Sequence, residues 1–167
     1  IPEFTVDKAV AKRWVVQGQV VYCRTILRGH EGRGIVIAKE LDELVDSPLY
    51  TKRFPNGREY RVHIAFDKVI QVVQKKKRKG TDANPMIRSN RNWVFARKID
   101  PPPPKVTSAA LQAHKALQLD FAAYDIVYSV KNDDARVLEA NTAPGLDNTS
   151  AALYSAAIVS HLKRLDN

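Results

Sequence analysis

The chain has one cysteine and no long apolar run, and each shortage excludes a class of protein. A single cysteine, Cys23, cannot form an internal disulfide, and four histidines beside it argue against a structural zinc site. No apolar run approaches the ~18 residues that a membrane-spanning helix needs. The first residues also lack the basic and then apolar pattern of a secretory signal. We therefore expect a cytoplasmic protein that does not contact a membrane.

The chain also has fewer acidic than basic residues, with 18 Asp and Glu against 27 Lys and Arg, which gives a net charge of +9. This excess predicts anionic partners such as nucleotide phosphates, nucleic acid or acidic substrates, without choosing among them. At 167 residues and 44% hydrophobic composition, the chain is long enough to bury a core as one domain or two small lobes.

Hydrophobic spacing and turn residues predict a mixture of helices and strands. The four prolines from Pro101 to Pro104 are expected to form an extended linker that cannot be helical. The predicted helices are 6–17 after a Thr5 cap, 106–119 capped by Thr107 or Ser108, and 151–165 capped by Thr149 or Ser150, with a short helical turn over 40–45. The predicted strands are 19–25, 35–39, 49–54, 59–66, 69–74, 93–96, 121–130 and 135–141.

The stretch LEANTAPGL, from Leu138 to Leu146, carries the most informative polar pair. Glu139 and Asn141 are two positions apart, so on a strand their side chains share one face, while Leu138 and Ala140 point into a core. A carboxylate and an amide oxygen at a strand end suit a hard cation such as Mg²⁺. Taken alone, the pattern fits a hairpin strand with two solvated polar residues better than it fits a metal site.

A third acid comes from the preceding strand. The residues KNDD, 131–134, predict a hairpin turn, and folding the chain about that turn brings Asp125 opposite Glu139 and Asn141. On the strand over 59–66, Glu59, Arg61 and His63 share one face, which can line a site or simply meet solvent. His114 is expected to be a surface or packing residue.

Two further stretches invite a functional interpretation. RGHEGRGI, 28–35, is a glycine-rich loop between two strands whose backbone N–H groups could approach phosphate oxygens, although taken alone it fits a mobile hairpin loop without a ligand better. KKKRK, 75–79, could contact nucleic acid or be a solvated strand end, and it has no aromatic residue to stack on bases. The composition of residues 80–92 predicts a mobile loop.

Together, the glycine loop between strands, the EYRV strand, the basic strand end, Asp125 after a helix and EANTAPGL resemble the ATP-grasp family over nearly the whole chain. The resemblance is strongest to carboxylate–amine ligases such as the glutamate-adding enzymes and glutathione synthetase. It implies an α+β fold in which two small lobes with antiparallel sheets grip the nucleotide. The ATP-grasp domain would span 1–167, with a flap-bearing lobe to about residue 50 and a metal-binding lobe over about 51–167. Family members usually carry a further N-terminal α/β domain, and the resemblance implies that this sequence begins where the nucleotide-binding lobe begins, either as a truncated piece with weak or no activity or as a minimal version.

The resemblance also implies roles for individual residues, transferred position by position. Lys52 stands where an acidic residue is frequent, and Arg24 stands where a lysine is common. Catalytic roles fall to Arg61, Lys75 and Arg88, and metal ligation to Asp125, Glu139 and Asn141. Nucleotide binding falls to Arg24, the flap residues Gly29, His30, Glu31, Gly32, Arg33 and Gly34, the hinge residues Lys52, Arg53 and Phe54, and Asn90.

The function implied by this resemblance is an ATP-dependent ligase that uses Mg²⁺, with two ions expected. It would join a carboxylate to an amine or a thiol through an acyl-phosphate. Its substrates are not specified by the sequence, and a peptide or protein is one option. A basic nucleic-acid-binding protein and a catalytically silent ATP-binding module are the two alternatives.

Overall fold

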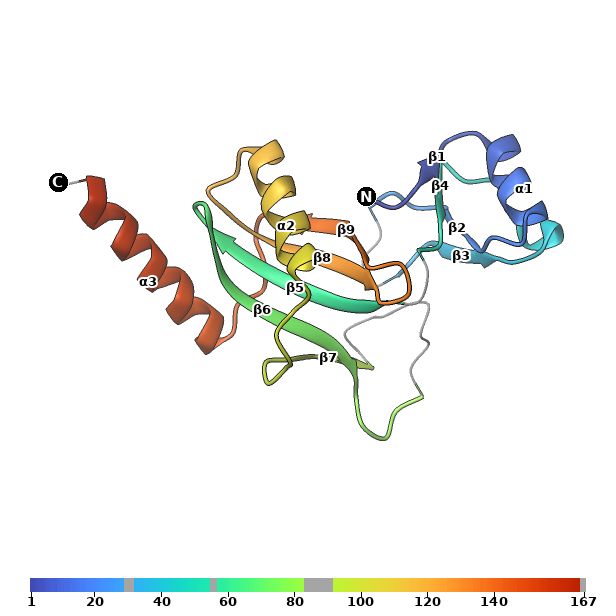
Figure 1. Ribbon diagram of the computed structural model, residues 1–167. Coiled ribbons are helices and arrows are strands. Elements are labelled where there is room, and N and C mark those ends of the chain that lie inside the picture. Colours follow the sequence, from blue (N-terminus) through green and yellow to red (C-terminus); the bar gives the residue numbers. More distant parts are fainter. Residues whose placement is uncertain (29–31, 55–56, 83–91, 166–167) are drawn as a thin grey trace. The chain divides into compact units, whose positions relative to one another are not determined.

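The computed structural model describes residues 1–28, 32–54, 57–82 and 92–165 (Figure 1). The described residues separate into two compact units. The first unit lies within Ile1–Pro55 and Lys77–Val94, and the second lies within Asn56–Lys76 and Phe95–Asn167. Each unit has its own antiparallel sheet and its own buried cluster of side chains.

The first unit is a four-stranded sheet with one helix. Its strands, in the order β1-β4-β2-β3, are all antiparallel to their neighbours. Helix α1 buries Ala11, Trp14 and Val15 in a cluster that also contains Cys23 and Tyr50. The elements are β1 (Phe4–Thr5), α1 (Lys8–Val16), β2 (Val21–Arg24), β3 (Ile35–Ala38), the 3₁₀ helix η1 (Leu41–Glu43) and β4 (Leu49–Lys52).

Helix α1 begins later than its sequence spacing predicts. The Asp7 carboxylate, rather than Thr5, caps it by accepting a hydrogen bond from the Ala9 N–H at 2.7 Å. Thr5 is instead the second residue of β1, and its hydroxyl oxygen accepts the Asp7 N–H. The predicted cap was wrong because two cap-type residues stand two positions apart and strand pairing with β4 engages the first of them.

The second unit is built on a five-stranded sheet in the order β7-β6-β5-β8-β9. The central pairings β6–β5, β5–β8 and β8–β9 are all antiparallel. The unit boundary follows Lys76 in β6 and Val94 in β7. The elements are β5 (Arg58–Ala65), β6 (Lys68–Lys77), β7 (Trp93–Ala96), α2 (Pro104–Leu117), β8 (Phe121–Ser129), β9 (Asp134–Asn141) and α3 (Asn148–Leu165).

Helix α2 covers one face of this sheet and forms the main core. Val106 and Ala110 pack on Tyr60 and Tyr124, which are buried residues of β5 and β8. The prediction of an extended linker was wrong at its end, because Pro104 is the first residue of the helix. Proline is tolerated there since the first helical N–H has no partner within the helix.

Near its C-terminal end, α2 packs on the sheet through His114 rather than through Leu117. Leu117 is 52% exposed, whereas His114 is buried and its Nδ1 lies 3.1 Å from the Tyr124 hydroxyl oxygen. His114 is therefore a packing residue, as the sequence predicts. Thr107 donates its hydroxyl proton to the Pro104 carbonyl oxygen and does not cap the helix.

Helix α3 contacts the opposite face of the sheet (Figure 1). It begins at Asn148, where the Asp147 carboxylate accepts the Ser150 N–H at 2.9 Å, so the predicted Thr149 or Ser150 cap was wrong. Ser150 and Tyr154 are its buried residues. Val159 and Leu162 are 50% and 54% exposed.

Strand β9 contains a β-bulge that its alternating sequence does not predict. Asp125 pairs with Glu139 but Ile126 pairs with Val137, so Leu138 is an extra residue without a partner in β8. Leu138 is 42% exposed, and its predicted place in the core was wrong. Val137 and Ala140 pack against the core, so the bulge lets Glu139 face the opposite side of the sheet.

Candidate functional site

A row of charged side chains crosses the sheet face opposite α2. Arg61 on β5 pairs in register with Asp125 on β8, and Asp125 pairs with Glu139 on β9. The Arg61 guanidinium donates to both oxygens of the Asp125 carboxylate, with Nε–Oδ1 at 2.7 Å and Nη2–Oδ2 at 2.9 Å. The hairpin predicted from the KNDD turn therefore brings Asp125 and Glu139 to directly opposite positions, as expected.

The Arg61–Asp125 pair is largely removed from solvent, with side chains 17% and 9% exposed. Burial alone would lower the pKa of Arg61, but the hydrogen bonds and charge of Asp125 and the charges of Glu139 and Glu59 raise it above its usual value. The guanidinium is therefore a permanent cation held in one orientation, which suits it to bind an anionic group.

Asn141 lies one step further along the same face of β9, opposite Ala123. Its amide nitrogen is buried and has no hydrogen-bond partner in the described structure. Asp125, Glu139 and Asn141 thus present two carboxylates and one carboxamide on one face of the neighbouring strands β8 and β9. Among the described residues no group of three His, Cys, Asp or Glu gathers as metal ligands, so the candidate set depends on the amide. Oxygen donors of these two kinds fit a hard divalent cation.

A second buried ion pair adjoins this row. Lys75 on β6 pairs in register with Glu59 on β5, and its ammonium lies 3.0 Å from the Glu59 carboxylate, with both side chains about one-tenth exposed. Phe95 on β7 contacts both cations, because its ring centroid is 4.4 Å from Arg61 Cζ and 5.6 Å from Lys75 Nζ. The family resemblance singled out the two cations but identified neither Glu59 nor Phe95 as their partners.

His63 completes the polar face beside α3. Its Nδ1 is 3.2 Å from the Tyr154 hydroxyl oxygen, and that hydroxyl donates to the Ala122 carbonyl oxygen at 3.2 Å. Burial, and then the charge of Arg61, lowers the pKa of His63 to about 4. Burial also raises the pKa of Tyr154 to about 12, so both groups are neutral at pH 7.

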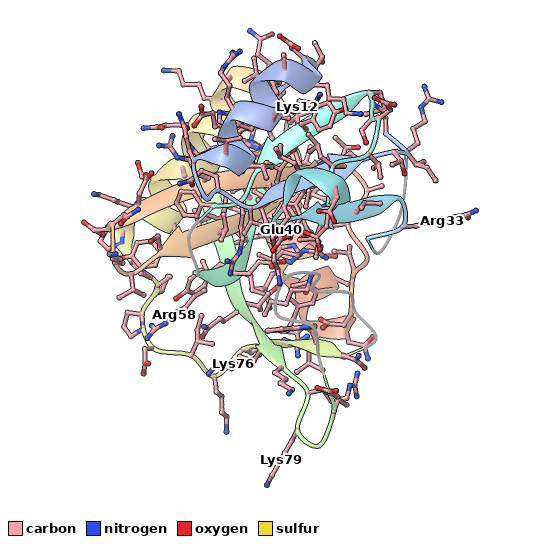
Figure 2. The ribbon with its side chains drawn as sticks, turned by 90° about the vertical axis from the view of Figure 1, so that its right-hand side faces the viewer. Lys12, Arg33, Glu40, Arg58, Lys76 and Lys79 are labelled. Carbon is pink, nitrogen blue, oxygen red and sulfur yellow. The ribbon has the colours of Figure 1, made fainter. Side chains whose placement is uncertain are left out.

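The glycine-rich loop of the first unit is partly described. Gly34 has a φ of +77°, and a Cβ at this position would lie 2.7 Å from the Ile26 side chain, so only glycine fits. The Gly34 carbonyl oxygen accepts hydrogen bonds from the Thr25 N–H and hydroxyl, which ties the two strands together. Gly32 also has a positive φ, and Arg33 projects outward from the loop (Figure 2). Gly29, His30 and Glu31 lie outside the described residues.

The remaining nucleotide-site candidates of the first unit lie on or just after its strands. Arg24 on β2 donates to the Thr51 hydroxyl oxygen at 3.3 Å. Lys52 on β4 forms an ion pair with Glu3, and its Nζ lies 5.9 Å from the centroid of the Trp14 ring. Arg53 and Phe54 follow β4, and the Arg53 N–H donates to the Val20 carbonyl oxygen. Arg88 and Asn90 lie outside the described residues.

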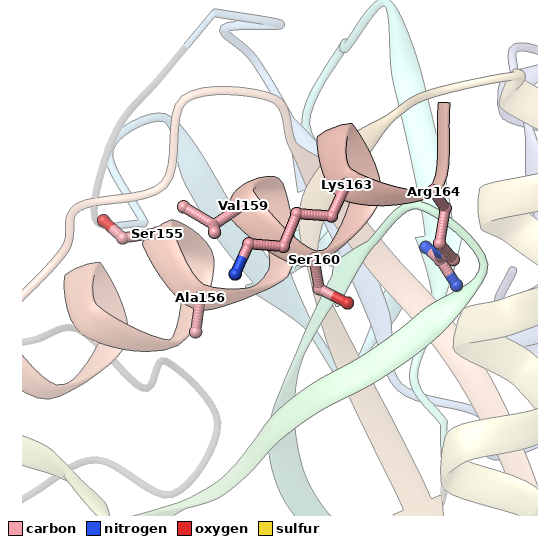
Figure 3. Close-up of a pocket in the computed structure, with 6 residues that line it drawn as sticks. All are labelled: Ser155, Ala156, Val159, Ser160, Lys163 and Arg164. Atoms are coloured by element: carbon pink, nitrogen blue, oxygen red, sulfur yellow. The ribbon is translucent and has the colours of Figure 1, made fainter. Parts of the chain in front are cut away.

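The basic run after Lys75 stays in solvent. Lys76 to Lys79 are all exposed, and the side chains of Lys76 and Lys79 extend away from the ribbon (Figure 2). Most of the predicted mobile loop, residues 83–91, lies outside the described residues. A surface pocket along α3 involves none of the candidate residues (Figure 3). That pocket is lined by Ser155, Ala156, Val159, Ser160, Lys163 and Arg164.

No protein-family model matches the chain. A curated protein from Aeromonas salmonicida (strain A449), described as a probable alpha-L-glutamate ligase, is 27% identical over 139 residues, which cover 76% of this chain and 44% of that protein.

Solved structures of ATP-grasp ligases resemble the chain more completely. The ligase PsnB in complex with a minimal precursor matches with a TM-score of 0.65 and 17% identity, over 95% of this chain and 55% of PsnB. The D-alanine–D-alanine ligase of Bacillus anthracis matches with a TM-score of 0.66 and 19% identity, over 95% of this chain and 57% of that ligase. The chain spans about half the length of these relatives.

None of the helices in the described part of the chain has the length and apolar character needed to span a membrane. The architecture, with two units that each carry an antiparallel sheet, is α+β, as the sequence predicts. The match to solved ligases extends over nearly the whole chain, and the chain therefore has the ATP-grasp fold.

Proposed function

We propose that the chain carries the nucleotide and metal sites of an ATP-dependent ligase that joins a carboxylate to an amine. The observation that carries this proposal is the row Arg61–Asp125–Glu139, with Asn141 beside it, on one face of the five-stranded sheet. The fold supports the proposal because the matched structures are ligases, among them complexes of PsnB with Mg and ADP and of the Bacillus anthracis enzyme with ATP.

Asp125, Glu139 and Asn141 are the proposed Mg²⁺ ligands. Two ions are proposed, because Glu139 neighbours Asp125 across the sheet and Asn141 along its own strand. Bound Mg²⁺ would neutralise phosphate charge and help to align the γ-phosphoryl group for transfer. The donor set fits this role, since carboxylate and amide oxygens are the ligands that Mg²⁺ takes from proteins.

The proposed reaction has two steps. In the first, a substrate carboxylate oxygen attacks the γ-phosphorus of ATP, the bond to the β-phosphate oxygen breaks, and ADP leaves. In the second, the amine nitrogen attacks the acyl carbon, the bond to the phosphate oxygen breaks, inorganic phosphate leaves and the amine loses a proton. Arg61, Lys75 and Arg88 are the proposed catalytic cations, which stabilise the negative charge that develops on oxygen in both steps.

The first unit is proposed to bind the nucleotide. Residues 29–34 would form the flap over the phosphates, where Gly32 and Gly34 already adopt positive φ values. Arg24, Lys52 to Phe54 and Asn90 are the other proposed nucleotide contacts. The division into a flap-bearing lobe and a metal-binding lobe is proposed for the whole chain, and the acceptor substrates are proposed to include peptides, because precursor peptides are bound in complexes of PsnB and MdnC.

Calorimetric titration with a non-hydrolysable ATP analogue, with and without Mg²⁺, tests the proposal. We expect binding that requires Mg²⁺, and we expect Glu139→Gln to weaken it at least about tenfold, because a neutral amide oxygen replaces a charged carboxylate ligand without changing the size of the side chain. Asp67→Asn is the matched control, because it removes one negative charge from an exposed turn of the same sheet.

Equal affinity in the wild type and Glu139→Gln would contradict the metal assignment. ADP release in the presence of candidate carboxylates and amines separates a ligase from a silent nucleotide-binding module. Removal of one preorganised cation in Arg61→Gln should then lower the turnover rate on the order of a hundredfold.

A further inference from the structure

Phe95 occupies an unusual place beside the proposed site. It lies on β7 at the edge of the sheet, one strand away from Arg61, because β6 separates β7 from β5. Its half-buried ring nevertheless reaches Arg61, whose Cζ lies 4.4 Å from the ring centroid, and also Lys75, whose Nζ lies 5.6 Å from it. Both distances fall within the ~6 Å over which an aromatic face attracts a cation.

Each cation is held from a second direction by a carboxylate. Asp125 accepts two hydrogen bonds from Arg61, and Glu59 accepts one from Lys75. The Arg61 and Lys75 side chains are only 17% and 9% exposed, so little water competes for them. Among the described residues, each cation therefore forms an ion pair with a carboxylate on β5 or β8, and both cations contact the ring of Phe95.

The choice of an aromatic partner has an electrostatic consequence. A third carboxylate at the position of Phe95 would bind both cations but would also cancel positive charge at the site. The face of an aromatic ring attracts cations through its quadrupole while carrying no net charge, so the cations keep their charge for an anionic ligand. The ring also offsets the mutual repulsion of two cations on neighbouring strands of the sheet.

We propose that Phe95 is a positioning residue that holds the Arg61 guanidinium and the Lys75 ammonium in the places from which they act. The contact geometry supports this inference by itself. Its consequence for catalysis rests on the ligase function proposed above, in which Arg61 and Lys75 stabilise negative charge on oxygen.

Nuclear magnetic resonance tests the placement of Arg61 without reference to activity. The ring-current shift reports its contact with Phe95, and the order parameter of the Arg61 Nε–Hε bond, which should fall in Phe95→Leu but not in Phe95→Tyr, reports whether the guanidinium keeps one orientation. Aromatic ring currents shift the signals of nuclei above the ring upfield, so the Arg61 Nε–Hε and Cζ signals should be shifted in the wild type. These signals are assigned from their loss in Arg61→Lys. We expect them to move downfield in Phe95→Leu, which keeps apolar bulk but removes the aromatic face. They should stay in place in Phe95→Tyr, which keeps the face.

The catalytic consequence is tested by steady-state kinetics of Mg²⁺-dependent ADP release. Loss of the aromatic partner in Phe95→Leu should lower kcat about tenfold and change the KM for ATP less than about threefold. Phe95→Tyr should retain the wild-type kcat. Phe121→Leu is the matched control, because Phe121 belongs to the same sheet but its ring neighbours Tyr154. It should leave kcat unchanged.

The outcomes separate this inference from the proposed function. Unchanged Arg61 signals in Phe95→Leu would overturn the positioning role, and so would a wild-type kcat in that variant. A wild-type chain that neither binds nor turns over nucleotide would overturn the ligase proposal, and the resonance measurement would then decide the role of Phe95 alone. Equal loss of kcat in Phe95→Leu and Phe95→Tyr would also count against the aromatic face, because both variants fill the space.

Discussion

His63 is a neutral histidine on a face that otherwise carries charge. The hydroxyl of Tyr154 donates to the Ala122 carbonyl oxygen, so its oxygen is left to accept the His63 Nδ1–H. Protonation of the ring would place a second cation near Arg61 in a buried environment, which is why the pKa of His63 falls to about 4. The fold therefore depends on His63 staying uncharged.

This dependence predicts how stability changes with pH. Between an ordinary histidine pKa of about 6.5 and the folded value of about 4, the unfolded chain binds a proton at residue 63 that the folded chain does not. The free energy of unfolding should therefore fall as pH is lowered through this window, by about 2 kcal/mol from His63 alone. Urea denaturation at several pH values measures the effect. His63→Gln should flatten this part of the profile, and an unchanged slope in that variant would contradict the prediction.

Gly57 is constrained by its neighbour rather than by its backbone angles. A Cβ at this position would lie 2.1 Å from the Tyr128 carbonyl oxygen, which is backbone and cannot rotate away. We expect Gly57→Ala to reduce the free energy of unfolding by about 2–3 kcal/mol, because strand β5 must shift to relieve the overlap. Gly145→Ala is the matched control, since a Cβ at Gly145 would have no neighbour within 4 Å. Equal denaturation midpoints for the two variants would refute this explanation.

At the scale of elements, helix α3 is attached to the sheet mainly through its first half. Ser150 donates its hydroxyl proton to the Gln71 side-chain oxygen at 2.9 Å, and Tyr154 bonds to both His63 and Ala122. Further along, the His161 ring stacks on Phe66 with centroids 3.8 Å apart. The second half exposes Val159 and Leu162, and Val159 lines the surface pocket (Figure 3).

Removing one hydroxyl should therefore loosen the helix. Tyr154→Phe leaves the ring in place but deletes both buried hydrogen bonds, which should cost about 1–2 kcal/mol. Hydrogen exchange of the α3 amides should accelerate about tenfold in this variant. Tyr128→Phe is the control, because the Tyr128 hydroxyl bonds to Asp133 in the β8–β9 turn. If α3 exchanged equally fast in both variants, the attachment would not depend on Tyr154.

The sequence predicts the elements better than it predicts their surroundings. Period-two alternation identified the strand carrying Arg61, and the turn residues KNDD identified the hairpin carrying Asp125 and Glu139. Both signals are local in the sequence. Partners brought in by distant strands were missed, as with Glu59 for Lys75 and Phe95 for Arg61. Helix starts were missed at Asp7 and Pro104, where strand pairing and an unneeded N–H override the usual cap preferences.

At the scale of the whole molecule, the net charge of +9 attracts any polyanion, so binding of nucleic acid by itself does not identify a function. Within the described part of the chain, the exposed run Lys76 to Lys79 offers four adjacent cations for such contacts. Binding that depends only on charge requires no Mg²⁺ and weakens steeply as salt is added. Binding at a site of hydrogen bonds and metal ligands depends less on salt, because buried groups are screened less.

These differences give a test of the two functions on the intact chain. We expect a single-stranded DNA oligonucleotide to lose most of its affinity when salt is raised about fourfold, whereas the Mg²⁺-dependent affinity for an ATP analogue should fall much less. Neutralising three exposed positions, in Lys76→Gln with Lys77→Gln and Lys79→Gln, should reduce only the binding of DNA. Tight, salt-resistant DNA binding that needs no Mg²⁺ would instead favour the nucleic-acid function.

The bulge at Leu138 has a consequence for how this sequence can change over time. Before the bulge, Ala135 and Val137 meet α2, and after it residues of the same parity, Glu139 and Asn141, meet the opposite side. If Leu138 were paired as an ordinary strand residue, alternation would put the two polar side chains on the core side. Deletion of Leu138 would instead make Glu139 follow Val137 directly, and alternation would still place Glu139 and Asn141 on the side opposite the core. Among descendants of this gene, position 138 should therefore accept most substitutions and also a deletion.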